Sequence, residues 1–526
     1  MTNKGVDFNG IYFYQWFVPV VTWSSIFGAA LGPIYAPLYW LSLVRSFAVL
    51  YCAVGISQCL HLFRAFDALN SEIFRSVSPT RPVPELDLEA IHGCRADNLL
   101  ETHFSTEISL YHLIVLPNYN ESVELLETTL KCLAEHPRAK TRYVVVLAME
   151  AAEEQYEGKA KLLVAKFGSS FHLIFYTVHL KGPDELGVAA NTNSAVRQAA
   201  AHLADTGYGT DEVIVTKIDA DAEVPSLYLD ALEREFRHAK DPFGMVFAPP
   251  VLFERNSDKV PRITRVMDFV WSALAWQQLH SDVGLPLSNF SISLQLLQEI
   301  EFLDTNAVSI AEDAHLFLKA FFKTRGRARL RGIFVPLNMA CVKSREGAWW
   351  SDVRARFVQA ERHFRGVNEM AYALKQTARC GLLGWRHARL LARVAEATLL
   401  PGLVPTYFVV SSVASAGAWL SLGGGSAELW AALASTAVLA NALPPIMALL
   451  WLAFHRIRSL SRRELFGLPP EGLNCLGFTC DLLWMAVASL GFMYIPHVAA
   501  ATRAVLPRQS LEYVRSPKPS KYLRQK

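Results

Sequence analysis

The chain has 526 residues, of which 52% are hydrophobic and 19% charged, with a formal net charge of +3. That charged fraction lies below the ~25% typical of soluble domains, which indicates that part of the surface does not face water. The small net charge gives no reason to expect a nucleic acid as partner. The eight cysteines are scattered without a Cys-x-x-Cys pair, which argues against a zinc site or a disulfide framework.

Apolar residues are concentrated towards the two ends of the chain. Residues 11–63 are almost unbroken apolar sequence, long enough for two membrane spans of ~20 residues each. The second apolar region predicts three further spans, near 398–422, 427–454 and 475–500. Arg45 lies either at a turn between the first two spans or on a surface facing the bundle interior. We favour the turn, because membrane arginines usually reach an interface.

The distribution of basic residues predicts the topology. Arginines border the apolar segments on the side of the central region, so the positive-inside rule places that region in the cytosol. The sequence leaves open whether the membrane is the plasma membrane or the Golgi membrane. The predicted division is N-terminal spans in 1–67, a cytosolic domain in 68–375, C-terminal spans in 376–505 and a basic tail in 506–526. Three C-terminal spans would put the basic tail outside. A short or re-entrant segment around Pro496 would remove that conflict.

Between the apolar ends, short β-branched runs alternate with helical patterns. The predicted strands are 113–116, 143–147, 172–178 and 213–218, and the predicted helices are 122–135, 157–167 and 190–204. This alternation predicts an α/β domain with a mainly parallel sheet and helices on both faces. Because ligands of such sheets bind beyond the carboxyl ends of the strands, the residues just after each strand are the candidates for a site.

Acidic residues follow two of these strands. Residues 117–121 read Pro-Asn-Tyr-Asn-Glu after the first strand, and Asp219-Ala220-Asp221 follows the fourth. Because side chains repeat with a period of two along a strand, Asp219 and Asp221 should point to the same side, where both could bind one ion. Two carboxylates suit Mg²⁺ or Mn²⁺, with substrate oxygens as further ligands. The alternative is a solvated acidic loop.

Two later segments carry further polar patterns. Glu312-Asp313-Ala314-His315 precedes an apolar helical pattern, and taken alone Asp313 would be the N-cap of that helix. Residues 349–366 form an amphipathic pattern with an aromatic apolar face and basic flanks. We expect that helix to lie in the membrane interface, and the alternative is a helix packed on the protein core.

Taken together and in this order, these segments resemble the family 2 inverting glycosyltransferases. The resemblance is to the membrane-bound class that includes cellulose, chitin and hyaluronan synthases, and it covers about 110–370. Its closest form is a branch with Glu-Asp-x-His and Gln-x-x-Arg-His-x-x-Gly motifs, which stand here at 312–315 and 359–366. The resemblance implies a nucleotide-sugar-binding domain of the GT-A type between transmembrane helices. It also makes Asp313 the catalytic base, in place of an N-cap.

The resemblance implies a role for each motif residue. The acid pair Asp219 and Asp221 would hold the metal, and Arg362 would pair with the diphosphate. The remaining assignments are Glu312 beside the base Asp313, Gln359, His363, Ser288 and Ser291 on the acceptor path, and Pro117, Tyr119, Glu121, Glu150, Asn191 and Ala220 at the nucleotide. The implied reaction moves a sugar, UDP-linked, from its nucleotide to a growing glycan, with export of the product.

Two departures from the family pattern keep other functions open. Glu150 stands nearest to where the family has an Asp for the nucleotide base, and Val188 stands where a lysine is usual. One alternative is therefore a non-processive transferase that acts on a lipid or protein acceptor. Another is a membrane scaffold that keeps the fold without activity.

Overall fold

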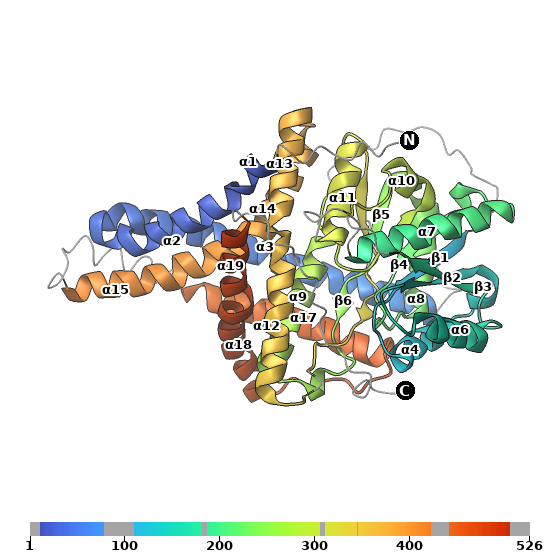
Figure 1. Cartoon of the computed structure of the whole chain (residues 1–526). Coiled ribbons are helices and arrows are strands. Elements are labelled where there is room, and N and C mark those ends of the chain that lie inside the picture. Colours follow the sequence, from blue (N-terminus) through green and yellow to red (C-terminus); the bar gives the residue numbers. More distant parts are fainter. Residues whose placement is uncertain are drawn as a thin grey trace.

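The computed structural model describes residues 11–77, 110–180, 187–305, 311–344, 346–421 and 441–504. An α/β body occupies one end of the molecule, and long helices from both ends of the chain extend from it side by side (Figure 1). The body thus lies between N-terminal and C-terminal apolar helices in sequence, and the two helical groups meet in space.

The body is built on a sheet of seven strands in the order β3-β2-β1-β4-β7-β5-β8. The strands are β1 Tyr111–Pro117, β2 Tyr143–Glu150, β3 Leu173–His179, β4 Val213–Lys217, β5 Met245–Ala248, β7 Phe290–Ser293 and β8 Arg329–Gly332. Strands β1 to β4 pair in parallel, whereas β7 lies antiparallel between β4 and β5. β6 Val251–Leu252 and β9 Leu337–Asn338 form a separate parallel pair. The predicted mainly parallel α/β fold is confirmed.

Helices cover both faces of this sheet. Along β2, Val144 and Val146 face a core that includes residues of α7, while Val145 and Leu147 face a core that includes residues of α4, α6 and α8. Strands buried on both faces need apolar residues at every position, which explains the unbroken β-branched runs in the sequence. The helices of the body are α4 Val123–Ala134, α5 Ala139–Arg142, α6 Tyr156–Phe167, α7 Gly187–Asp205, α8 Ser226–His238, α9 Arg262–Gln278, α10 Leu294–Glu299, α11 Glu312–Lys323, α12 Trp349–Phe364 and α13 Asn368–Cys380.

Within the described residues, four helical stretches are long and apolar enough to cross a membrane, which indicates a multi-pass membrane protein. They are Phe13–Tyr35, Pro37–Ser76, Trp385–Gly417 and Cys475–Arg503. The elements that form them and the neighbouring α17 are α1 Ile11–Gln15, α2 Phe17–Tyr35, α3 Pro37–Val77, α14 Trp385–Pro405, η7 Thr406–Val410, α15 Ser411–Ser421, α17 Leu443–Glu464, α18 Cys475–Ser489, η8 Leu490–Tyr494 and α19 Ile495–Arg503. The first part of the span expected near 427–454 lies outside the described residues.

Arg45 does not lie at a turn between spans. The chain turns at Ala36, and Arg45 lies about two helical turns into α3, where its Nη2 donates to Ser42 Oγ at 3.1 Å. The favoured prediction for this residue was therefore wrong, because the first span ends earlier than the apolar run alone indicates.

The amphipathic helix α12 turns its apolar face towards protein. Phe357 and Ala360 pack into a cluster with Met267 of α9 and Ala488 of α18. At the start of the helix, Trp350 remains 75% exposed. This face is therefore covered by α18 and α19, and the expectation that the helix lies in the membrane interface stays a prediction.

Candidate active site

The carboxyl ends of the first four strands meet at one edge of the sheet. In-register parallel pairing places Pro117 of β1, Glu150 of β2 and His179 of β3 along that edge. Lys217, the last residue of β4, pairs with β1 at Val115 and belongs to the same edge. This arrangement makes the edge the expected ligand site of the sheet.

Lys217 joins two of the acidic motifs. Its side chain is buried, and its Nζ lies 2.8 Å from Asp219 Oδ1 and 3.8 Å from Glu312 Oε1. The same ammonium donates to the backbone oxygen of Ser288 at 2.7 Å. Burial alone would lower the pKa of Lys217, but the charges of Asp219 and Glu312 outweigh burial and raise it. One charged lysine therefore gathers residues that lie far apart in sequence.

The sequence interpretation missed Lys217. A lysine as the last residue of an otherwise fully buried strand, two positions before an acid, is the signal that could have revealed it. Charged side chains are almost never fully buried unless they are paired, so a strand-end lysine predicts a nearby carboxylate.

The acid pair does not continue the strand. β4 ends at Lys217, and the chain then turns, with the backbone N–H of Ala222 donating to the carbonyl of Asp219 at 3.0 Å. The premise that a strand period of two aligns the two carboxylates is therefore wrong. Asp219 is 26% exposed, whereas Asp221 is buried and its Oδ2 accepts from the backbone N–H of Ala340 at 3.1 Å.

The donor set around this turn fits a hard divalent cation that shares its ligands with a substrate. Asp219 and Asp221 offer carboxylate oxygens, the ligands that Mg²⁺ and Mn²⁺ prefer. Within the described ranges, no group of three or more His, Cys, Asp or Glu side chains gathers that could hold a metal by itself. Mg²⁺ sites of one or two carboxylates are normally completed by phosphate oxygens and water.

Asp313 is poised to exchange a proton near neutral pH. It lies in the first turn of α11, whose N-cap is Ala311, so the interpretation of Asp313 as the N-cap is wrong. Burial, followed by the charges of Glu312 and Asp219, raises the pKa of Asp313 to about 7. A general base works best when its pKa lies near the working pH. Glu312, 3.8 Å from Lys217 Nζ, has a cation beside it.

His315, two residues further along α11, is a structural clamp. Its Nδ1 lies 2.7 Å from Glu369 Oε2 of α13, and its Nε2 lies 2.9 Å from Asp304 Oδ2. Burial alone would lower the pKa of His315, but Glu369 and Asp304 outweigh burial and raise it to about 9. The imidazolium therefore ties the first turns of α11 to α13.

Replacement of His315 by Gln is expected to reduce stability in a pH-dependent way. An imidazolium with a folded pKa of about 9 and an unfolded pKa near 6.5 contributes on the order of 3 kcal/mol below pH ~6.5, and this contribution is lost as pH rises through about 9. Thermal unfolding in detergent at pH 6 and pH 10 measures it. The difference in Tm between wild type and His315→Gln should be largest at pH 6, and an equal difference at both pH values would contradict the clamp.

The Gln-x-x-Arg-His segment lies in the last turns of α12. The chain after this segment passes beside the start of α11. A Cβ added at Gly366 would lie 3.5 Å from the Cβ of Ala311, the residue before Glu312. Gln359 Oε1 is buried and has no hydrogen-bond partner among the described residues, which makes it an acceptor open to a ligand. His363 is exposed and meets Trp271 edge-on, with 5.8 Å between ring centroids. Arg362 is half-buried on the same helix.

The residues expected at the nucleotide divide into two groups. Tyr119 is 37% exposed at the sheet edge, and its backbone N–H donates to the carboxylate of Glu121. Glu150 Oε2 lies 3.0 Å from His179 Nδ1. Asn191, in contrast, is buried, with its Nδ2 donating to the carbonyl of Ala148 at 2.8 Å. Tyr119 and Glu150 therefore have side chains at the edge, whereas Asn191 joins α7 to β2.

Ala220 and Ser291 are held inside the fold. Ala220 is 6% exposed, and its carbonyl accepts from Thr129 Oγ1 at 2.7 Å. Ser291 is fully buried, and its Oγ lies 2.9 Å from both Thr216 Oγ1 and Tyr228 OH. These contacts make Ser291 a packing residue of the sheet and give no support to its predicted place on the acceptor path.

Ser288 and Asn289, just before Ser291, lie at the acids instead. Ser288 accepts from Lys217 through its carbonyl, and Asn289 Oδ1 accepts from the backbone N–H of Asp219 at 2.8 Å. Asn289 is a second residue that the sequence interpretation missed, and it positions the backbone of the acid pair.

Comparison with protein families relates part of the chain to a known family. Residues 214–454 match the family described as glycosyl transferase family group 2. The matched stretch begins in β4, continues into α17 and contains both acidic motifs and the Gln-x-x-Arg-His segment. This stretch is a glycosyltransferase family 2 domain. The protein is therefore an enzyme of nucleotide-sugar chemistry.

Comparison with individual proteins does not define the function further. No curated protein sequence matches the glycosyltransferase. Among solved structures, a similar chain is the mannosyltransferase PcManGT from Pyrobaculum calidifontis in complex with GDP-Man and Mn²⁺, at 17% identity and a TM-score of 0.44. The alignment covers 85% of this chain and 99% of that chain. A likeness at this level carries no conclusion on the donor or the metal.

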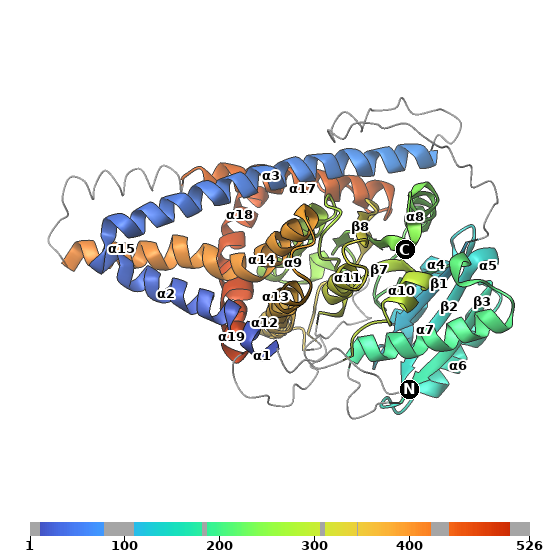
Figure 2. The same cartoon turned by 90° about the horizontal axis from the view of Figure 1, so that it is seen from above.

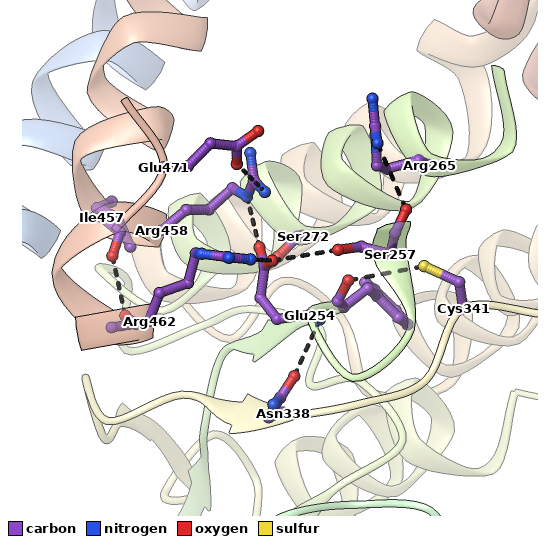
Figure 3. A network of polar contacts seen from close by, with 12 residues as sticks. Glu254, Ser257, Arg265, Ser272, Asn338, Cys341, Ile457, Arg458, Arg462 and Glu471 are labelled. Carbon is purple, nitrogen blue, oxygen red and sulfur yellow. Dashed lines mark hydrogen bonds and ion pairs between the residues drawn. The ribbon is translucent and has the colours of Figure 1, made fainter. Parts of the chain in front are cut away.

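The glycosyltransferase domain is anchored to helix α17 by a buried carboxylate. Glu254, just after β6, is fully buried and accepts from Arg458 Nε and Arg462 Nη1, each at 2.6 Å (Figure 3). Burial alone would raise the pKa of Glu254, but the two arginines outweigh burial and lower it. Arg458 also pairs with Glu471 at 2.7 Å. The end of α17 thus lies on the same side as the catalytic domain.

The two residues after Glu254 reach the candidate active site. Arg255 Nη1 donates to the carbonyl of Asp221. Asn256 accepts from the backbone N–H of Cys341 at 2.7 Å and donates to the carbonyl of Cys341 at 3.0 Å. Three consecutive residues thus connect α17, the acid pair and the segment whose Ala340 holds the carboxylate of Asp221.

Proposed function

We propose that the enzyme transfers a sugar from a UDP-sugar to a growing glycan at the membrane, with inversion at the anomeric carbon. The observation that carries the proposal is the meeting of two acidic motifs on Lys217 at the carboxyl edge of the sheet. The pKa of Asp313 is raised to about 7, and the negative charge of Asp219 contributes to that rise. An acid pair and a base at one point are what a single in-line displacement requires.

In this proposal Asp313 accepts the proton of the attacking acceptor hydroxyl. Lys217 holds the carboxylates of Asp219 and Glu312 in place, and Asn289 fixes the backbone of Asp219. Asp219 and Asp221 would hold Mg²⁺ or Mn²⁺, which when bound offsets the charge of the leaving diphosphate. Arg362 would pair with the diphosphate, because its planar guanidinium suits phosphate oxygens.

Other residues would bind the two substrates. Tyr119, Glu121, Glu150 and Pro117 lie at or next to the carboxyl edge of the sheet and would contact the nucleotide. Gln359 and His363 would contact the acceptor, and the buried, unpartnered Gln359 Oε1 supports that role for Gln359. The cytosolic domain would draw its donor from the cytosol, and the apolar helices at both ends would keep the product at the membrane.

Transfer of labelled sugar by membranes that contain the purified enzyme tests this function. UDP-GlcNAc, UDP-glucose, UDP-glucuronate and GDP-mannose are supplied separately and mixed, with Mg²⁺, with Mn²⁺ or with EDTA. We expect a UDP-sugar to be incorporated into a polymer, and EDTA to abolish incorporation. A lipid-linked monosaccharide would favour the non-processive alternative, and full activity in EDTA would contradict the role of Asp219 and Asp221.

A further inference from the structure

The last apolar helix of the structure, the continuous stretch α18-η8-α19, runs in an unexpected direction. It covers Cys475–Arg503 and by length and composition alone suits a membrane span. In both views it lies crosswise to α2, α3 and α15, which run together away from the body (Figures 1 and 2). It lies where those helices meet the catalytic domain, alongside α12.

Both ends of this stretch are tied to the catalytic domain by ion pairs. Arg262 Nε of α9 lies 2.8 Å from Asp481 Oδ1, and Arg503 Nη1 lies 3.1 Å from Glu361 Oε1 of α12. A helix from Asp481 to Arg503 extends about 33 Å, roughly the thickness of the hydrocarbon core. A spanning helix would place one of these two pairs on the opposite side of the membrane, away from the domain that supplies its partner.

The domain residues that hold the two ends belong to one rigid unit. α9 and α12 are joined by a buried ion pair, with Arg356 Nε 2.8 Å from Asp268 Oδ1. Met267 of α9 and Ala360 of α12 share an apolar cluster with Ala488 and Phe492 of the crosswise stretch. The middle of the stretch is therefore packed on the same two helices as its ends.

The opposite face of the stretch is apolar and exposed. Leu476, Leu483, Val487 and Ile495 are exposed by 73%, 67%, 51% and 52% respectively. Their spacing of seven, four and eight residues places them on one side of a helix. We call these four residues the apolar stripe. A continuous exposed stripe of this kind marks a surface that meets lipid or another partner.

We propose that α18-η8-α19 lies in the plane of the membrane interface, with the apolar stripe in the acyl boundary, and that the chain beyond Arg503 stays on the catalytic side. The bilayer is the occupant that fits. The stretch touches the first turns of α2, where Thr22 Oγ1 lies 3.2 Å from His497 Nε2 and Trp23 Nε1 donates to Thr502 Oγ1 at 3.1 Å. The membrane that α2 enters therefore begins beside the stretch.

This position also explains the charge of the remaining sequence. The ion pairs of Arg458 and Arg462 with Glu254 place the end of α17 on the catalytic side before the stretch begins. An in-plane stretch leaves the chain on that side. The sequence beyond it is basic, with Arg515, Lys518, Lys521, Arg524 and Lys526. Basic segments next to apolar ones favour the cytosolic side, which a third C-terminal span would deny them.

The side of the chain beyond the stretch is tested with a protease cleavage site fused after Lys526. The enzyme is placed in sealed vesicles in which the catalytic domain faces outward, as shown by cleavage at an identical site inserted after the exposed Gly168. We expect the protease to remove the tag from intact vesicles as fast as it cleaves at Gly168. A tag that is cleaved only after detergent is added would overturn the proposal.

The depth of the apolar stripe is tested by fluorescence quenching. A fluorescent non-natural amino acid replaces Leu476, Leu483, Val487 or Ile495 one at a time, in bilayers of lipids brominated at different acyl carbons. All four positions should be quenched most by shallow bromines, whereas the control Leu31 in α2, itself 49% exposed, should be quenched most by deeper ones. A depth that changes steadily from 476 to 495, or the absence of quenching at all four positions, would contradict the in-plane position.

Discussion

Asp313→Asn is expected to lower the rate of sugar transfer by about 10²–10⁴-fold, the usual contribution of a positioned general base. The asparagine keeps the size of the side chain but cannot accept the proton of the acceptor hydroxyl. Because Asp313 makes its one described hydrogen bond within its own helix, to the backbone N–H of Ala314 at 2.7 Å, the fold should tolerate the change. Initial rates with saturating donor, together with thermal unfolding, measure both effects.

The pH dependence of the wild-type rate should identify the same residue. A carboxyl group whose pKa is raised to about 7 keeps its proton below that pH, so the base is active above about pH 7 and inactive below it. The rate should fall with decreasing pH through this range, and the fall should be absent in Asp313→Asn. Glu299→Gln, which removes an exposed carboxylate paired with Arg327, is the control and should keep full rate. A full rate in Asp313→Asn would refute the assignment.

Glu254→Gln is expected to destabilise the enzyme by ~3–5 kcal/mol, the usual effect of removing one partner from a buried ion pair. The substitution leaves Arg458 and Arg462 buried without their carboxylate, and both arginines belong to helix α17. The amide keeps the shape of the side chain, so the loss reports charge and hydrogen bonding. Thermal unfolding in detergent and resistance to limited proteolysis measure it.

Glu471→Gln provides the matched control for that experiment. Glu471 pairs with the same Arg458 at 2.7 Å but is 43% exposed, whereas Glu254 is fully buried. An exposed pair contributes ~0–1 kcal/mol, so this variant should unfold close to the wild-type temperature. Equal losses of stability in the two variants would show that the burial of Glu254 is not what stabilises its contact with α17.

The fold could be predicted from the sequence where local pattern determines structure. The strands that end at Pro117, Glu150 and Lys217 are buried on both faces, so their apolar runs show plainly in the sequence. The strand β7 could not be found in this way, because it is short and lies antiparallel between strands that are distant in sequence. The predicted sheet was therefore confirmed in type but incomplete in its strands.

The site was predictable in its motifs and less so in its contacts. The sequence pattern brought Asp219 and Asp313 into one hypothesis, but their common neighbour Lys217 has no motif of its own. Ser291 was misplaced because burial on a central strand depends on Tyr228, which lies 63 residues away. The direction of α18-η8-α19 likewise depends on its ion pairs with distant arginine and glutamate residues, since its composition is that of a span.

The loop of Glu254, Arg255 and Asn256 has a consequence for how the enzyme works in a bilayer. It holds α17 at one end and the peptide of Asp221 at the other, through contacts that are buried and hydrogen-bonded. α17 packs along α3, which is long and apolar enough to cross a membrane, so the position of α3 in the bilayer and the placement of that acid cannot be set independently. A bilayer whose thickness does not match α3 strains both, so lipid chain length becomes a variable of the reaction rate as well as of membrane insertion.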